Sequence, residues 1–194
     1  MATVTALSTK LMTADEFWDW QHRPEHADRE FELVRGEVVE VSRPGGRHGV
    51  VCVNGVRILG NFAFDRKRGY LCANDTGVIL EREPDTVRGP DVIFYNETRH
   101  LDEVNPKFLE TPPDLAMEVL SPNDRMPKVM RRVAEFLRQG IKLVWVLDPE
   151  EREITVFRAG KDHYVLSEKD DLTGDDVLPD FRCHVTDFFM MPGE

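Results

Sequence analysis

Several features that would assign a chain to a class at once are scarce or missing in this 194-residue sequence. The three cysteines, Cys52, Cys72 and Cys183, are far apart and form no CxxC pair. Their spacing argues against a zinc ribbon, and their odd number argues against a disulfide framework. The cysteines are therefore interpreted as buried, reduced thiols in a protein of the cytoplasm.

Long apolar runs are missing too. No stretch reaches the roughly 18 residues that a membrane-spanning helix needs, and the first residues, MATVTALSTKLMTADEF, lack the apolar segment of a secretory signal. The motifs GxGxxG, GxxxxGK(S/T), GxSxG and HExxH are absent. We therefore expect no membrane association and no site built on these four motifs.

Positive charge is in deficit. Lysine and arginine number 25 against 36 aspartates and glutamates, which gives a formal net charge of −11. A protein that binds nucleic acid normally shows a basic footprint, so this charge counts against such a partner. A metal site needs clustered carboxylates, however, and a local basic stripe can coexist with an acidic whole.

The arrangement of the patterned segments predicts one domain, over residues 13–194, after a loose tail at 1–12. Thr13 and Glu16 form a capping-box pattern at the start of a short helix. The alternating run FELVRGEVVEV predicts a β-hairpin that turns at Arg35-Gly36.

A long helix is expected from His48 onward, because apolar residues recur there at helical spacing. Strands follow in GYLCANDTGVILER, VRGPDVIFY and TPPDLAMEVLSP, then a helix over about 128–139 and a hairpin made by IKLVWVLDP and REITVFRAG. The remainder is expected to hold a short strand, a polar loop and a packed end. This order predicts an α/β (α+β) fold with a central mixed β-sheet flanked by helices.

Three acidic residues lie in or beside apolar strands: Asp91 after Pro90, Glu118 within MEVL, and Glu32 within FELV. A carboxylate in such a position is costly unless it is paired, protonated or bound to a metal. If these acids converge at one sheet end, they form an oxygen site suited to Mg²⁺ or Mn²⁺. The alternatives are a turn-opening aspartate at position 91 and a solvated edge strand at position 32.

Basic residues follow on the helix after Glu118. Lys128 and Arg132 are four residues apart and share a helix face, with Arg131 beside them. A cation there could polarise an attacking water or stabilise the charge on a phosphate in the transition state. The alternative is a helix face exposed to water.

Two further residues could support such a site. His48 at the start of the long helix could contact a phosphate or carry a proton, or it could simply cap the helix. Asp75 lies in NDTG, which is also a good turn sequence.

The motif order resembles the Uma-type family of restriction endonucleases, which is assigned to the PD-(D/E)xK nuclease superfamily. The similar segments are FELVRGE, RHG, NDTG, VRGPDV, PPDLAMEVLSPND, LVWVLDPE and LTGDDVLPDF, over about residues 13–189. The resemblance implies that Asp91 and Glu118 are the two motif acids, that the Val119 backbone carbonyl completes the metal shell, and that Glu32 is an additional acid. Leu120 departs from the pattern, which has lysine two residues after the second acid, so Lys128 or Arg132 would supply the cation.

Two main hypotheses follow. The first is a Mg²⁺- or Mn²⁺-dependent endonuclease that hydrolyses DNA. This hypothesis includes a homodimer, since cutting two strands is simplest with two sites. The second is a catalytically impaired, nuclease-like module that binds nucleic acid or a protein. A metal-dependent phosphohydrolase of small nucleotides is a third hypothesis.

Overall fold

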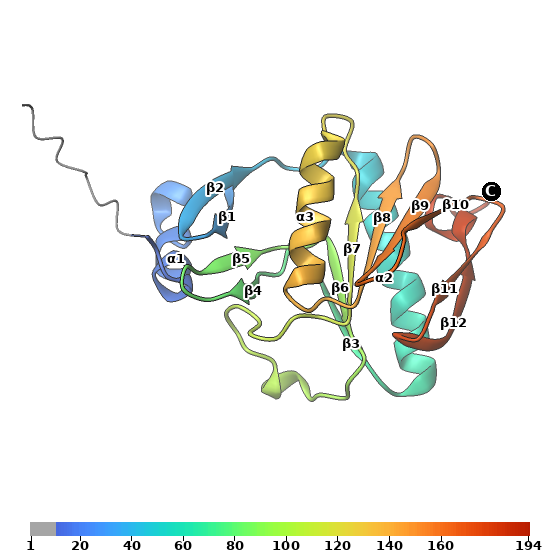
Figure 1. Ribbon diagram of the computed structural model, residues 1–194, viewed down its shortest axis with the longest axis horizontal. Helices are drawn as coiled ribbons and strands as arrows, with labels where there is room; N and C mark the ends of the chain where they lie inside the picture. Colours follow the sequence, from blue (N-terminus) through green and yellow to red (C-terminus); the bar gives the residue numbers. More distant parts are fainter. Residues whose placement is uncertain (1–10) are drawn as a thin grey trace, which may run out of the picture.

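The computed structural model describes residues 11–194 (Figure 1). Residues 1–10 of the predicted tail therefore lie outside the described residues. Of the tail's last two residues, Met12 donates its N–H to the carbonyl of Gly36 at 3.0 Å. The end of the predicted tail is thus attached to the turn of the first hairpin.

A six-stranded mixed sheet forms the centre of the molecule, as the sequence predicts. Its strand order is β10-β9-β8-β7-β6-β3, in which β7 and β8 are parallel and the other neighbours are antiparallel. The strands are β3 (Tyr70–Ala73), β6 (Val92–Tyr95), β7 (Leu115–Val119), β8 (Leu143–Asp148), β9 (Glu153–Arg158) and β10 (Tyr164–Ser167).

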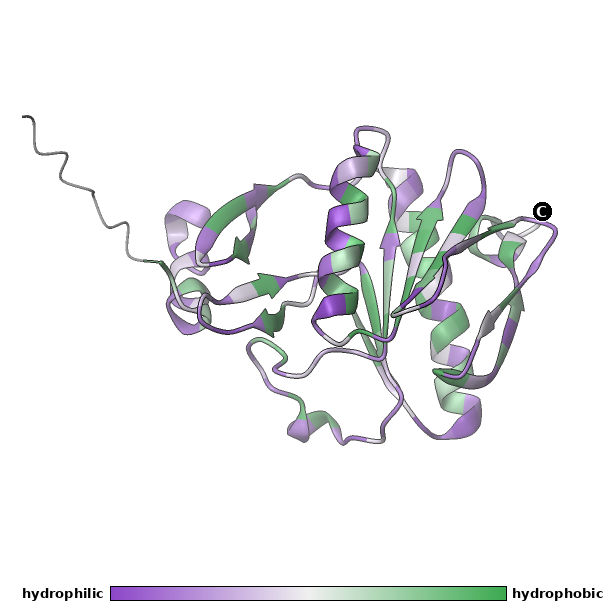
Figure 2. Ribbon diagram, in the orientation of Figure 1, coloured by the Kyte–Doolittle hydropathy of each residue, from purple (hydrophilic) through white to green (hydrophobic). Residues whose placement is uncertain are grey.

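Helices cover both faces of this sheet, which explains why β7 and β8 are apolar on both sides. On one face, α2 (Gly46–Arg66) packs against a core that contains Met117 and Trp145. On the other, α3 (Met126–Arg138) buries Phe136 against Ala116 and Val144. Figure 2 shows the hydrophobic colour concentrated in these central strands and the polar colour on the outer side of α3.

A second sheet, which the sequence did not indicate, lies at the N-terminal end of the molecule beside the predicted central sheet (Figure 1). Its order is β2-β1-β5-β4, all antiparallel. The strands are β1 (Glu30–Val34), β2 (Glu37–Val41), β4 (Val78–Glu81) and β5 (Thr86–Arg88). Its core includes Leu33, Val87 and Phe17, the last from α1 (Ala14–Gln21). The predicted hairpin is present as β1 and β2. The predicted capping box is present as well: the Thr13 hydroxyl accepts from the N–H of Glu16 at 3.2 Å, and Glu16 accepts from the N–H of Thr13 at 3.0 Å.

The C-terminal part also differs from the expectation, because the predicted polar loop contains two strands. They are β11 (Asp171–Gly174) and β12 (Leu178–His184), which pair as an antiparallel ribbon. Three short 3-10 helices complete the described part of the chain: η1 (Pro24–His26), η2 (Leu101–Glu103) and η3 (Val185–Phe188). Within residues 11–194, no helix is long and apolar enough to span a bilayer.

Candidate active site

Asp91 and Glu118 face each other across two neighbouring strands. The register of β6 and β7 pairs Val92 with Met117, so the next positions outward bring Asp91 opposite Glu118. Residues directly opposite on antiparallel strands project from the same face of a sheet. Asp91 is also tied to β7 by Val119, whose N–H donates to Asp91 Oδ2 at 2.7 Å. The proximity expected from the sequence is therefore present.

Glu118 is buried with one oxygen free. Its Oε2 lies 2.8 Å from Arg132 Nε, and its side chain is 16% exposed. Among residues 11–194, its buried Oε1 has no hydrogen-bond partner. Burial, together with the charges of Asp91 and Glu32, outweighs the effect of Arg132 and raises the pKa of Glu118 to about 8. Such an oxygen is suited to a cation that neutralises it.

Glu32 lies near the same place but is fully engaged. It accepts from Arg132 Nη1 at 2.8 and 2.9 Å, from Arg88 Nη1 at 2.9 Å and from the N–H of Gly89 at 3.0 Å. Burial opposes ionisation of Glu32, yet the two arginines and Gly89 outweigh it and lower its pKa. Arg88 also donates to Glu135 of α3 at 2.6 Å, so this network ties the small sheet to the main one.

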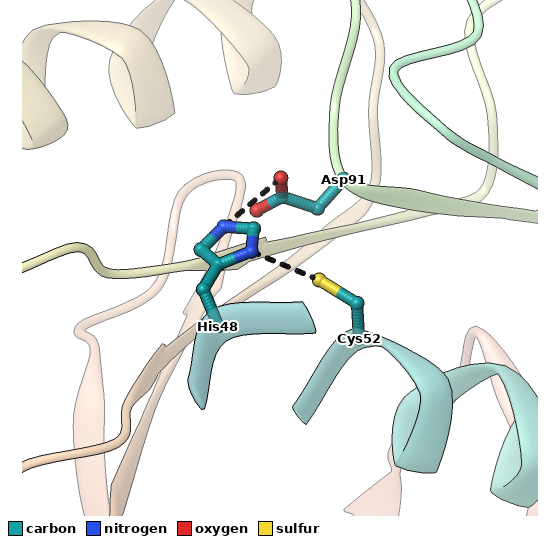
Figure 3. Close-up of side chains that lie close together, drawn as sticks. All are labelled: His48, Cys52 and Asp91. Atoms are coloured by element: carbon teal, nitrogen blue, oxygen red, sulfur yellow. Dashed lines mark hydrogen bonds and ion pairs between the residues drawn. The ribbon is translucent and has the colours of Figure 1, made fainter. Parts of the chain in front are cut away.

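His48 contacts Asp91 from the first turn of α2 (Figure 3). Its Nε2 lies 3.2 Å from Asp91 Oδ1, and its Nδ1 lies 3.4 Å from Cys52 Sγ, one turn further along the helix. Burial opposes protonation of the imidazole, but the hydrogen bonds to Asp91 and Cys52 outweigh it and raise the pKa of His48 to about 10. The hydrogen bond to Asp91 therefore favours the protonated form of His48, which would balance the charge of Asp91.

Asp75 lies at the rim, in the turn between β3 and β4. Asn74 and Asp75 both have left-handed backbone angles, with φ of 59° and 53°. Gly89 allows this turn to come close, because a Cβ at Gly89 would lie 2.4 Å from the carbonyl oxygen of Asp75. Partial burial and the negative charge of Asp91 raise the pKa of Asp75 to about 6. The negative charge of Asp91 thus contributes to the raised pKa of both Asp75 and Glu118.

The three cations of α3 occupy different environments. Arg132 is directed inward, where its guanidinium contacts Glu118 and Glu32 and donates to the carbonyl of Gly89 at 2.9 Å. Lys128, one turn earlier, and Arg131 are exposed on the groove side of the helix. Within the described part of the chain, the Lys128 ammonium has no ion-pair partner.

One groove of about 1880 Å³ is lined by Glu32, His48, Asp75, Asp91, Glu118, Lys128, Arg131 and Arg132. Pockets for single small molecules are usually about 300–1,000 Å³. Nine basic and eight acidic residues line the groove, whereas the whole chain has 25 and 36. The groove is thus large enough for part of a polymer, and its lining is less acidic than the chain as a whole.

Sequence reasoning missed three residues of this site: Arg88, Glu135 and Cys52. For Cys52 a signal existed, because His48 and Cys52 are four apart on a predicted helix and so share a face. Arg88 and Glu135 gave no signal, since their pairing joins positions 47 residues apart.

The mixed sheet covered by helices, with carboxylates at one strand end beside a groove, is the architecture of a restriction-endonuclease-like α/β protein. The sequence profile of the Uma2 family, described as "Putative restriction endonuclease", matches residues 14–186, and the chain belongs to that family. A crystal structure of "a putative nuclease belonging to DUF820" from Anabaena variabilis ATCC 29413 superposes with a TM-score of 0.76 at 18% identity, over 92% of this chain and 97% of that one. This structural likeness establishes the shared fold. No curated protein matches the sequence.

Proposed function

We propose that this protein is a divalent-metal-dependent endonuclease that hydrolyses DNA phosphodiester bonds at Asp91 and Glu118. The observation that carries the proposal is the buried, unpartnered Oε1 of Glu118, opposite Asp91 in a groove of polymer size. Membership of the Uma2 family supports the same reaction class.

The donor set around Glu118 fits a hard cation. Carboxylate and carbonyl oxygens are the ligands that Mg²⁺ and Mn²⁺ prefer, and Asp91, Glu118 and the Val119 carbonyl would hold the ion. When bound, the ion supplies Lewis-acid polarisation, orients water and neutralises charge on a phosphoryl oxygen. Glu32 would join this set only after giving up contacts with Arg88 and Arg132.

Lys128 is the better supported source of the cation that faces the substrate. Arg132 is held on two carboxylates and a carbonyl, so its role is to position Glu118 and Glu32. Lys128 is exposed on the groove one helical turn away, where its ammonium can reach a phosphate.

Plasmid cleavage in Mg²⁺ or Mn²⁺ tests this proposal. We expect Asp91→Ala and Glu118→Gln to lower the rate by at least about 100-fold, and Lys128→Ala by more than Arg131→Ala on the same exposed turn. Asp176→Asn, an exposed carboxylate outside the groove, serves as the control. Cleavage that persists in Asp91→Ala would exclude the assigned site.

A second candidate function is a nuclease-like module that binds nucleic acid or a protein without cutting. The favouring observations are Leu120 in place of the pattern's lysine and the engagement of Arg132 by two acids. Calorimetry separates the two, because the module predicts no binding of Mg²⁺ or Mn²⁺ at millimolar concentration.

We also propose a homodimer, because two sites are the simplest way to cut both strands of a duplex. Light scattering coupled to size-exclusion chromatography tests this directly. A monomer that still linearises plasmid would overturn it.

A further inference from the structure

The geometry points to a second metal-binding site, in which His48, Cys52 and Asp91 take up a thiophilic divalent ion such as Zn²⁺. His48 and Cys52 come from the first turns of α2, and Asp91 directly precedes β6 (Figure 3). One ligand atom from each lies within 4.8 Å of the other two. This site is distinct in donor chemistry from the all-oxygen site proposed at Asp91 and Glu118.

The helix sets the separation of two of the donors. Cys52 follows His48 by four residues, which places both on one face of α2. Their Nδ1 and Sγ atoms are 3.4 Å apart. A tetrahedral zinc ion with Zn–N of about 2.0 Å and Zn–S of about 2.3 Å holds such atoms roughly 3.5 Å apart. The pair already stands at the spacing that the ion requires.

Asp91 supplies the third donor. Its Oδ1 now contacts His48 Nε2, while its Oδ2 accepts from the N–H of Val119. One donor atom of each residue already lies within 4.8 Å of the other two, so the Nδ1–Sγ pair can stay in place while the Asp91 carboxylate turns from Nε2 toward the ion. Water completes the tetrahedron, as in sites with three protein ligands.

The donor types select the ion. Nitrogen and thiolate ligands favour Zn²⁺ and Co²⁺, whereas Mg²⁺ takes oxygen ligands. Binding releases one proton from the Cys52 thiol and one from the His48 imidazolium to the solvent. The thiolate and Asp91 then balance the two positive charges of the ion, so no buried charge is left uncompensated.

Sharing of Asp91 has a functional consequence that rests on the proposed function. A zinc ion that holds Asp91 withdraws it from Glu118, so the soft ion and Mg²⁺ compete for one carboxylate. Zinc is therefore expected to inhibit the proposed nuclease rather than to activate it.

Cobalt substitution tests the site without any cleavage assay. Co²⁺ bound through Cys52 gives a near-ultraviolet sulfur-to-cobalt charge-transfer band. We expect this band in the native protein and in Cys72→Ser, a half-buried cysteine outside the cluster, and its loss in Cys52→Ser. Calorimetry should show at least about a tenfold loss of Zn²⁺ affinity in Cys52→Ser. Cys52→Ala repeats the test if the serine variant does not fold.

Absence of the band in the native protein, or its persistence in Cys52→Ser and Cys52→Ala, would overturn the site. Equal loss in Cys72→Ser would overturn it as well. Inhibition by zinc is then measured relative to each variant's own rate in Mg²⁺, and relief in Cys52→Ser supports the competition. If the protein never cleaves DNA, the cobalt band still decides the site, so the two proposals fail independently.

Discussion

Glu32 and Glu118 are both buried, both contact Arg132, and come from different sheets. Around Glu32, two guanidinium groups and a backbone N–H point at the carboxylate, and its pKa is lowered. Around Glu118, a single ion pair leaves one oxygen without a partner in the described residues, and the pKa rises to about 8. The exposed fractions of the two side chains, 8% and 16%, are both small. The number of donors therefore decides the charge of each acid.

The difference separates a carboxylate whose oxygens are all engaged from one that can still take a ligand. The Glu32 network joins β1 and β5 of the small sheet to α3 of the main sheet through Arg88, Arg132 and Glu135. A carboxylate with every oxygen engaged stabilises an arrangement but has little capacity for a ligand. Glu118 retains that capacity, which is why the proposed metal site centres on it.

Substitution of Glu32 should have the largest effect on the free energy of unfolding. Glu32→Gln removes the carboxylate that Arg88 and Arg132 share, which leaves these partly buried cations with only Glu135 and Glu118 as counter-ions. We expect a loss of about 3 kcal/mol in the free energy of unfolding. Urea unfolding at pH 7 measures it. Glu40→Gln on the paired strand, which removes an exposed ion pair with Arg29, is the matched control. Equal effects of the two substitutions would contradict the structural role assigned to Glu32.

Substitution of Glu118 should have the opposite effect, because Glu118→Gln should stabilise the protein by an amount that increases with pH. Since the folded-state pKa is raised, the folded protein holds more protons than the unfolded one between about pH 4.5 and 8, and stability falls as pH rises through that window. Glu118→Gln cannot ionise and avoids this loss. The variant should gain on the order of 1–3 kcal/mol relative to the native protein between pH 5 and pH 8.

Urea unfolding at both pH values in the presence of a chelator measures this gain. A stability difference that stays constant with pH would show that burial does not hold Glu118 protonated. Adding Mg²⁺ at pH 8 should then stabilise the native protein more than the variant, because only the native protein has a carboxylate at position 118.

Local rules explain which parts were predictable. The hairpin at Arg35-Gly36 and the long helix follow from periodicities of two and of about 3.6 residues. The adjacency of Asp91 and Glu118 follows from acids placed at the ends of apolar strands that pair in sequence order. Each of these features depends on a short stretch of sequence.

The rest depends on contacts between distant segments. Thr86–Arg88 is too short to show a strand pattern, and it joins β1 and β4 rather than the central sheet. The Arg132–Glu32 pair spans 100 residues, so the sequence alone could not show that this arginine is already engaged. That engagement is what shifts the proposed cation from Arg132 to Lys128.

Substitution of Asp85 is expected to have the smallest effect. Asp85 is a buried acid that, like Glu32, accepts several hydrogen bonds, and it lies between β4 and β5 of the small sheet. It accepts from the N–H of Ala14 at 2.8 Å, from Arg82 at 2.9 Å and from the N–H of Glu83 at 3.2 Å. Burial opposes its ionisation, but these donors outweigh burial and lower its pKa. Asp85→Asn should cost about 1 kcal/mol at pH 7.

The cost should fade in acid, and the sign follows from the lowered pKa. The stabilising contribution of Asp85 is fully present above the unfolded value of about 3.9 and is lost as the pH falls through the lower folded value. Urea unfolding of both proteins from pH 7 down to pH 3 follows the difference, with Asp176→Asn as the exposed control. If the stability difference between the native protein and Asp85→Asn instead grows as the pH falls, the folded-state pKa of Asp85 is not lowered. The number of hydrogen-bond donors would then not determine the charge of a buried acid in this protein.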